Sequence, residues 1–125
     1  MMSAASMAEP AQTRKRTTTP VRIHRSGTEP LAATLLDISP SGAFVELEAP
    51  LEVGTPLEVE LQIPADGALR LAGTVVRQGR MAKPMPHPKI EHLVVRVPGV
   101  GLRFEGLAAN QTLQLGQFLS TLEEG

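Results

Sequence analysis

The chain contains no cysteine, no tryptophan and no tyrosine, and only three of its 125 residues are phenylalanine. Without cysteine it cannot form disulfides, thiolate zinc sites or a cysteine nucleophile. The scarcity of aromatic rings argues against a single-stranded nucleic-acid binder, which stacks several bases on such rings. The formal net charge of -1 provides no overall positive field that would attract DNA. We therefore expect no DNA partner.

Long hydrophobic runs are also absent. No run of apolar residues is long enough to span a bilayer, and residues 1–13 lack the apolar core of a signal peptide. We therefore expect a cytoplasmic protein with no membrane insertion. Hydrophobic residues make up 42% of the 125 residues, which is enough for the core of one domain.

The residue types that carry catalysis or bind metals show no telling arrangement. The three histidines, His24, His87 and His92, have no ligand-like spacing with carboxylates, so we expect no metal. Ser39, His24 and Asp37 are the residue types of a hydrolase triad, but nothing in their spacing indicates its geometry. We expect neither an enzyme nor a cofactor.

Alternating apolar and polar residues predict a chain made mainly of strands. The clearest case is Leu57, Val59, Leu61 and Ile63, which alternate with acidic and amide residues. Similar patterns predict strands at 21–25, 31–38, 43–47, 69–78, 93–97 and 100–104. Pro98-Gly99 separates the last two and suggests a bulge or kink.

Two further segments complete the predicted architecture. Three prolines in residues 79–89 indicate either an extended surface loop or the end of a long hairpin. Near the C-terminus the period becomes helical, at Leu115, Phe118, Leu119 and Leu122, with Asn110 as the expected N-cap. The predicted fold is all-β, an antiparallel barrel of six to seven strands with one C-terminal α-helix.

The N-terminal segment differs from the rest of the chain. Residues 1–19 have little to bury, and we expect a flexible tail that contains the basic segment Arg14-Lys15-Arg16. Residues 20–125 are then the barrel domain with its helix. A solvated tail is the simplest interpretation of these cations, and a contact with an anionic ligand is the alternative.

A turn rich in polar groups connects two of the predicted strands. It holds Asp37, Ser39 and Gly42 within six residues, a composition typical of a tight turn. Asp37 and Ser39 can satisfy their hydrogen bonds within the turn, or they can contact a ligand. The sequence alone leaves these two interpretations about level.

The turn resembles the (Asp/Asn)-x-Ser-x-x-Gly motif of PilZ domains, the bacterial receptors of cyclic di-GMP. Residues 99–104 are similar to the closing strand of that family, and the resemblance spans residues 14–122. It implies a PilZ-type barrel that binds cyclic di-GMP through Arg14, Lys15, Arg16, Asp37, Ser39 and Gly42. An Arg fork matches phosphate or guanine O6 and N7, and a carboxylate matches the guanine N1–H and N2–H₂ edge.

One position departs from the family pattern. PilZ domains carry an Arg-x-x-x-Arg pair before the first strand, and the register set by Pro20 puts Arg14 at its first position and Thr18 at its second. Two functions therefore stay open. The chain is either a cyclic di-GMP receptor that acts on an unidentified protein partner, or an adaptor without nucleotide, for example in motility or polarity control.

Overall fold

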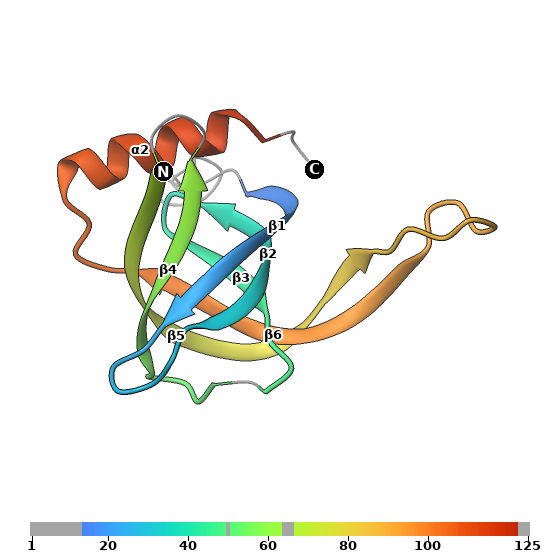
Figure 1. Cartoon of the computed structure of the whole chain (residues 1–125), viewed down its shortest axis with the longest axis horizontal. Helices are drawn as coiled ribbons and strands as arrows, with labels where there is room; N and C mark the ends of the chain where they lie inside the picture. Colours follow the sequence, from blue (N-terminus) through green and yellow to red (C-terminus); the bar gives the residue numbers. More distant parts are fainter. Residues whose placement is uncertain (1–13, 50, 64–66, 123–125) are drawn as a thin grey trace, which may run out of the picture.

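The computed structural model describes residues 14–49, 51–63 and 67–122. They form six strands and one C-terminal helix (Figure 1). The elements are β1 (Lys15–His24), β2 (Leu31–Ser39), β3 (Gly42–Glu46), β4 (Pro56–Ile63), β5 (Gly67–Pro84), β6 (Val94–Phe104) and α2 (Ala109–Ser120). All neighbouring strands are antiparallel, and the sheet closes into a barrel in the order β1-β2-β3-β6-β5-β4. The predicted fold class is confirmed, with six strands.

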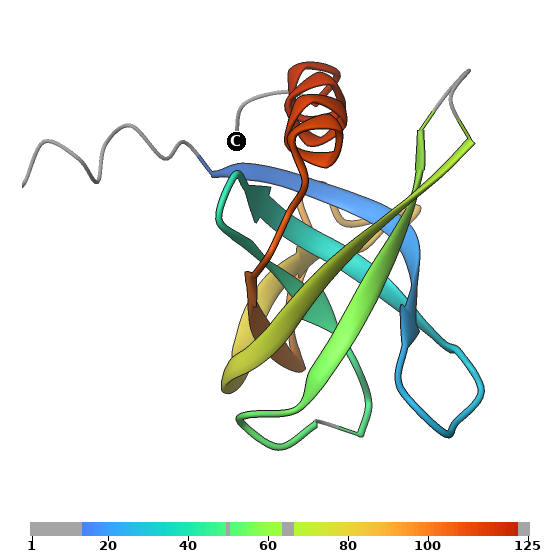
Figure 2. The same cartoon turned by 90° about the vertical axis from the view of Figure 1, so that its left-hand side faces the viewer.

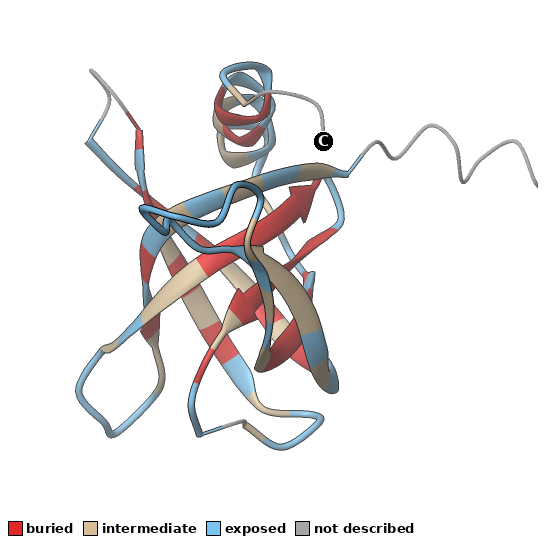
Figure 3. Ribbon diagram, turned by 90° about the vertical axis from the view of Figure 1, so that its right-hand side faces the viewer, coloured by how far each residue is buried: buried red, intermediate tan, exposed pale blue. Residues whose placement is uncertain are grey.

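The barrel core follows from the alternation of the strands. In β4, Leu57, Val59, Leu61 and Ile63 are buried, and the residues between them are partly or fully exposed. Because successive side chains point to opposite faces of a strand, the apolar set fills the barrel interior. Figure 3 shows the buried segments along the barrel strands and the connecting loops as mostly exposed.

The helix α2 lies across one end of the barrel (Figures 1 and 2). Leu115, Phe118 and Leu119 are buried and belong to the same core cluster as the strand residues. The predicted N-cap is wrong, because Ala108 rather than Asn110 precedes the helix. Gln111 takes over at this end: its Oε1 accepts the Ala108 N–H at 2.8 Å, and its Nε2 donates to the Arg70 carbonyl at 2.8 Å.

The first strand begins earlier than the sequence suggests. β1 starts at Lys15 rather than Val21, so the predicted tail boundary at residue 19 is wrong, and residues 1–13 lie outside the described residues. Lys15 and Arg16 pair with Ile38 and Asp37 of β2. The apolar alternation that reveals other strands is missing here because this stretch consists of Lys15 and Arg16 followed by three threonines. Threonine is β-branched and suits a half-exposed strand.

The predicted bulge at Pro98-Gly99 is also wrong, because β6 runs without interruption and pairs Pro98 with Arg80 and Gly99 with Gly79. Pro98 accepts a hydrogen bond from the Leu47 N–H at 3.1 Å, just past the last residue of β3. The nitrogen of Pro98 therefore faces the side on which pairing with β3 has already ended. The missing N–H removes no hydrogen bond of the ladder there. The ladder irregularities lie instead in β1, in β2 and between Val75 and Arg77 of β5.

The proline-rich segment forms the end of a long hairpin. β5 and β6 continue pairing as far as Pro84 and Val94, and we call residues 79–98 the arm. The arm extends away from the barrel body (Figure 1). Arg16 and Lys83 connect it to other strands: Arg16 Nη2 donates to the Ala82 carbonyl at 2.8 Å, and Lys83 Nζ lies 2.7 Å from Glu46 Oε1.

We expect Leu119→Ala to lower the free energy of unfolding by about 2 kcal/mol, the lower part of the range for a buried leucine at a site that can relax. Leu119 is only 9% exposed and packs into the core cluster. Leu113→Ala on the same helix is the matched control, because Leu113 is 64% exposed. Urea denaturation of both variants provides the comparison, and equal effects would contradict the capping role of α2.

Candidate functional site

The site is built around the β2–β3 hairpin. Ser39 pairs with Gly42, so Pro40 and Ser41 form a two-residue loop. Ile38 belongs to the barrel core, and its neighbours Asp37 and Ser39 therefore point to the outer face of the sheet. Asp37 and Ser39 are nevertheless buried, at 5% and 0% exposure.

A guanidinium fork covers the Asp37 carboxylate. Arg14 Nη2 lies 2.7 Å from Asp37 Oδ1, and Arg14 Nε lies 3.1 Å from Asp37 Oδ2. The same guanidinium reaches Ser39 Oγ at 3.4 Å through Nη1. The hydrogen bond to Asp37 raises the pKa of Arg14, an effect that burial partly opposes. The Arg14 side chain is 47% exposed, so its positive charge lies at the surface and covers a carboxylate that is itself buried.

Ser39 is bonded mainly within its own turn. Its Oγ accepts the Ser41 N–H at 3.3 Å and lies 3.3 Å from Ser41 Oγ and 3.5 Å from the Gly42 carbonyl. Asp37 differs, because both of its oxygens accept hydrogen bonds from Arg14, a residue distant in sequence. The local-turn interpretation therefore fits Ser39, whereas Asp37 is held by a contact across strands.

Gly42 serves close packing of strands. A Cβ at this position would lie 2.1 Å from the Leu102 carbonyl oxygen of β6. No side chain fits there unless the backbone moves, so the motif glycine lets β3 and β6 approach behind the turn.

The three residues of the basic segment, at the start of β1 and just before it, make different contacts. Arg14 contacts Asp37 and Ser39, and Lys15 lies opposite Ile38 in the ladder. Arg16 lies opposite Asp37, but its guanidinium binds the arm at Ala82. The structure thus brings Arg14, Asp37 and Ser39 together, with Gly42 beside them.

Thr18, at the second Arg position of the family pattern, faces a different part of the molecule. It lines a groove of about 750 Å³ together with the tip of the arm, including His87, Glu91 and His92. The hydroxyl of Thr18 offers no charge at this place. Position 18 therefore supplies no guanidinium to the site.

Sequence reasoning missed Phe44 and Arg77. Phe44 lies directly opposite Asp37 in the ladder, on the outer face of β3, yet it is 0% exposed. The guanidinium carbon of Arg77, from β5, lies 5.1 Å from the centre of the Phe44 ring. The available signal was the set of glycines at 79, 99 and 101, whose contacts are described below.

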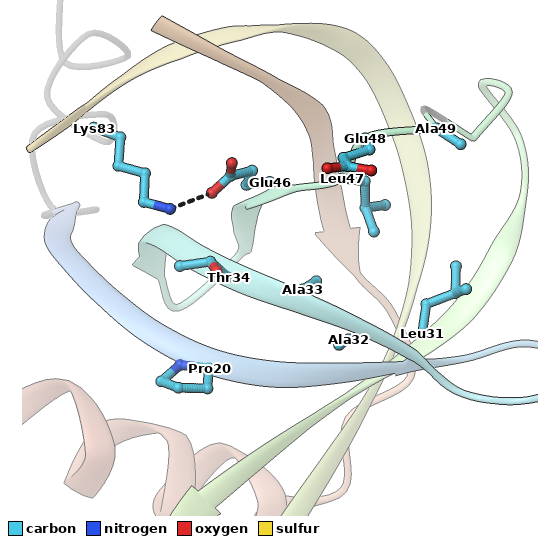
Figure 4. Close-up of a pocket in the computed structure, with 10 residues that line it drawn as sticks. All are labelled: Pro20, Leu31, Ala32, Ala33, Thr34, Glu46, Leu47, Glu48, Ala49 and Lys83. Carbon is cyan, nitrogen blue, oxygen red and sulfur yellow. Dashed lines mark hydrogen bonds and ion pairs between the residues drawn. The ribbon is translucent and has the colours of Figure 1, made fainter. Parts of the chain in front are cut away.

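A separate groove of about 620 Å³ lies on the outer wall, between β2, the end of β3 and the arm (Figure 4). Small residues of β2, Ala32, Ala33 and Thr34, are among those that line it, together with the Lys83–Glu46 ion pair. None of Arg14, Asp37 and Ser39 lines this groove, so it is distinct from the motif site.

Within residues 14–49, 51–63 and 67–122, no three His, Asp or Glu side chains come together as a metal site would require. None of the helices in that part of the chain is long and apolar enough to cross a membrane.

Comparison with known proteins identifies the architecture. The profile of the PilZ domain matches residues 11–121. Among solved structures, the PilZ domain of YcgR from Escherichia coli with cyclic di-GMP superposes with a TM-score of 0.65 at 16% identity, covering 89% of this chain and 88% of that one. No curated protein sequence is significantly similar.

Two longer proteins share the fold. MrkH of K. pneumonia, described as a cyclic di-GMP-dependent transcription regulatory factor, superposes with a TM-score of 0.66 at 12% identity over 88% of this chain. MotI/DgrA of Bacillus subtilis, an inhibitor of motility, gives 0.62 at 17% identity over 88%. The chain spans about half the length of each, 49% and 48%. At these identities the likeness shows the fold alone.

Proposed function

The chain belongs to the PilZ domain family, and from this premise we propose that it is a non-catalytic receptor module that binds cyclic di-GMP at the Arg14–Asp37–Ser39 site and acts on a protein partner. The observation that carries the proposal is the Arg14 fork on the buried Asp37, at 2.7 and 3.1 Å. The two groups belong to the basic segment and the motif turn, which are 23 residues apart in sequence.

The chemistry of the pair fits a guanine nucleotide. Guanine presents two neighbouring donors, N1–H and N2–H₂, which match the two oxygens of Asp37. Those oxygens are occupied by Arg14, so the guanidinium has to turn outward for guanine to reach the carboxylate. Half exposed, Arg14 can do so and then contact a phosphate or the guanine O6 and N7 edge. Arg14 immediately precedes β1, which contacts the arm through Arg16.

The proposal is tested by calorimetric titration of the whole chain with cyclic di-GMP at low salt. A saturable heat is expected, together with a rise in melting temperature, because a ligand that binds only the folded state stabilises it. GTP at equal concentration serves as the control for general anion binding. A flat trace at high micromolar ligand would rule out the receptor function.

The adaptor alternative rests on Thr18, the uncharged residue at the second Arg position. If the barrel has lost the nucleotide, its partner must recognise the protein alone, in a process such as the motility control named for MotI/DgrA. Thr18 faces the arm rather than Asp37, which is the observation in favour of this alternative. The same titration distinguishes the two functions.

We expect Thr18→Arg to strengthen cyclic di-GMP binding about 10-fold, because it restores the Arg-x-x-x-Arg spacing with Arg14 and adds a charge-assisted hydrogen bond. The gain should shrink as salt rises, since the new cation lies near solvent. Glu91 lines the same groove and can pair with the new arginine, so the variant is compared with Thr18→Arg/Glu91→Gln. An unchanged affinity in both would show that this position no longer contributes to the site.

A further inference from the structure

Three glycines leave a stretch of β5 and β6 bare of side chains on the outer face of the sheet. Gly79 and Gly99 are paired in the ladder, and Gly101 is paired with Arg77. A Cβ at Gly99 would lie 2.1 Å from the Val45 carbonyl oxygen and 2.8 Å from Phe44 Cε1. A Cβ at Gly101 would lie 3.0 Å from Arg77 Cγ. A Cβ at Gly79 would lie 3.0 Å from Arg77 Nη1. The side chains of Phe44 and Arg77 therefore lie over these glycines.

The Arg77 side chain lies across the neighbouring strand at these glycines. Its aliphatic part runs over Gly101 of β6, and its guanidinium ends above the Phe44 ring of β3, 5.1 Å from the ring centre. Phe44 is the ladder partner of Asp37 on β2. The Phe44 ring reaches Gly99 of β6, and Arg77 Nε and Nη1 lie beside Gly101 of β6 and Gly79 of β5. The guanidinium is therefore about two strand spacings, about 10 Å, from the strand that carries Asp37, a separation that a ligand with two nucleotides can span.

The position and charge of Arg77 suit a ligand contact. Within the described part of the chain, no carboxylate pairs with Arg77, and the residue is exposed although the ring beneath it is buried. The aromatic face holds the planar guanidinium by a cation–π contact and leaves N–H donors for a phosphate or for guanine O6 and N7. A guanidinium held in place loses less entropy on binding than one on a mobile side chain.

We propose that Arg77, laid over Phe44 across Gly101, supplies the second guanidinium of the cyclic di-GMP site, the role for which position 18 offers only a hydroxyl. This inference rests on the proposed function. Arg14 binds one part of the nucleotide at Asp37, and Arg77 binds a phosphate or the second guanine from the opposite side of Phe44. The arginine pair thus comes from two distant strands instead of one segment.

The test is calorimetric titration with cyclic di-GMP of Arg77→Met, whose unbranched side chain still covers Phe44 but carries no charge. The affinity is expected to fall about 10-fold to 30-fold, the loss of one charge-assisted hydrogen bond, with the melting temperature nearly unchanged. Arg70→Met is the matched control, because Arg70 is an exposed arginine of the same strand, paired with Glu58. It removes the same charge and should leave binding intact.

Gly101→Ala provides a second perturbation that leaves the charge in place. The new Cβ would press on Arg77 Cγ and Nε, at 3.0 and 3.1 Å, and move the guanidinium off the ring. It should weaken binding in the wild-type background and add no further loss to Arg77→Met, a non-additivity that marks a shared mechanism.

The outcomes separate this inference from the function on which it rests. If the wild type binds and Arg77→Met binds equally well, Arg77 only covers Phe44 and the inference is overturned. If Arg70→Met loses as much as Arg77→Met, the effect is one of net charge, which also overturns it. If the wild type itself shows no binding, the receptor function fails together with the inference.

Discussion

Gly42→Ala is expected to destabilise the protein by roughly 3 kcal/mol or more, the upper end of the cost of overpacking. The added Cβ would lie 2.1 Å from the Leu102 carbonyl oxygen, a backbone atom that cannot turn aside as a flexible side chain can. β3 and β6 would have to separate beside the motif turn, which would break ladder bonds between Gly42 and Arg103. The melting temperature should fall on the order of 10 °C.

Gly116→Ala is the control for this substitution. Gly116 lies in α2, and a Cβ there would meet nothing within 4 Å. Alanine is the better helix former by about 0.5–1 kcal/mol, so this variant should be slightly more stable than the wild type. The same chemical change thus has opposite signs at the two positions. If Gly42→Ala proved as stable as the wild type, the motif glycine would act through the ligand rather than through packing.

Much of the fold could be predicted because its strands carry apolar alternation. β4 is the clearest case, and the helical spacing of Leu115, Phe118 and Leu119 identifies α2 equally well. The start of β1 was missed because cations and threonines contain no apolar signal, and what fixes them is pairing with β2. That pairing is a contact across the chain, which local pattern does not contain.

The candidate site was predictable only in part, for a similar reason. The motif turn stands in one continuous stretch of sequence, so Asp37, Ser39 and Gly42 could be recognised together. Arg77 reaches over Phe44 from β5 because β6 has a glycine at the crossing point, and Phe44 is buried on the outer face beneath it. The register between β2, β3, β6 and β5 sets this arrangement. The sequence of a single strand does not contain that register.

Asp37→Asn is expected to weaken cyclic di-GMP binding by at least about 100-fold, with little loss of stability. The guanine edge presents two donors, whereas asparagine offers one acceptor and directs its own NH₂ donors toward the ligand. A ligand binds much more weakly when its buried donors lose their acceptors, because those donors stay unpaired in the complex. Arg14 loses its partner in this variant, but its side chain is 47% exposed and can be hydrated, so stability should fall by about 1 kcal/mol or less.

Arg14→Ala should destabilise the protein more than Asp37→Asn does. It leaves the Asp37 carboxylate buried at 5% exposure without the fork that neutralises it, which costs roughly 1–3 kcal/mol. The double variant Arg14→Ala/Asp37→Asn should therefore be more stable than Arg14→Ala alone, because the unpaired buried charge is gone. Urea denaturation of the four proteins in this cycle measures the asymmetry, and titration measures binding. Equal destabilisation by the two single substitutions would mean that the carboxylate is solvated without Arg14. The Arg14 side chain would then have no part in shielding Asp37 from water.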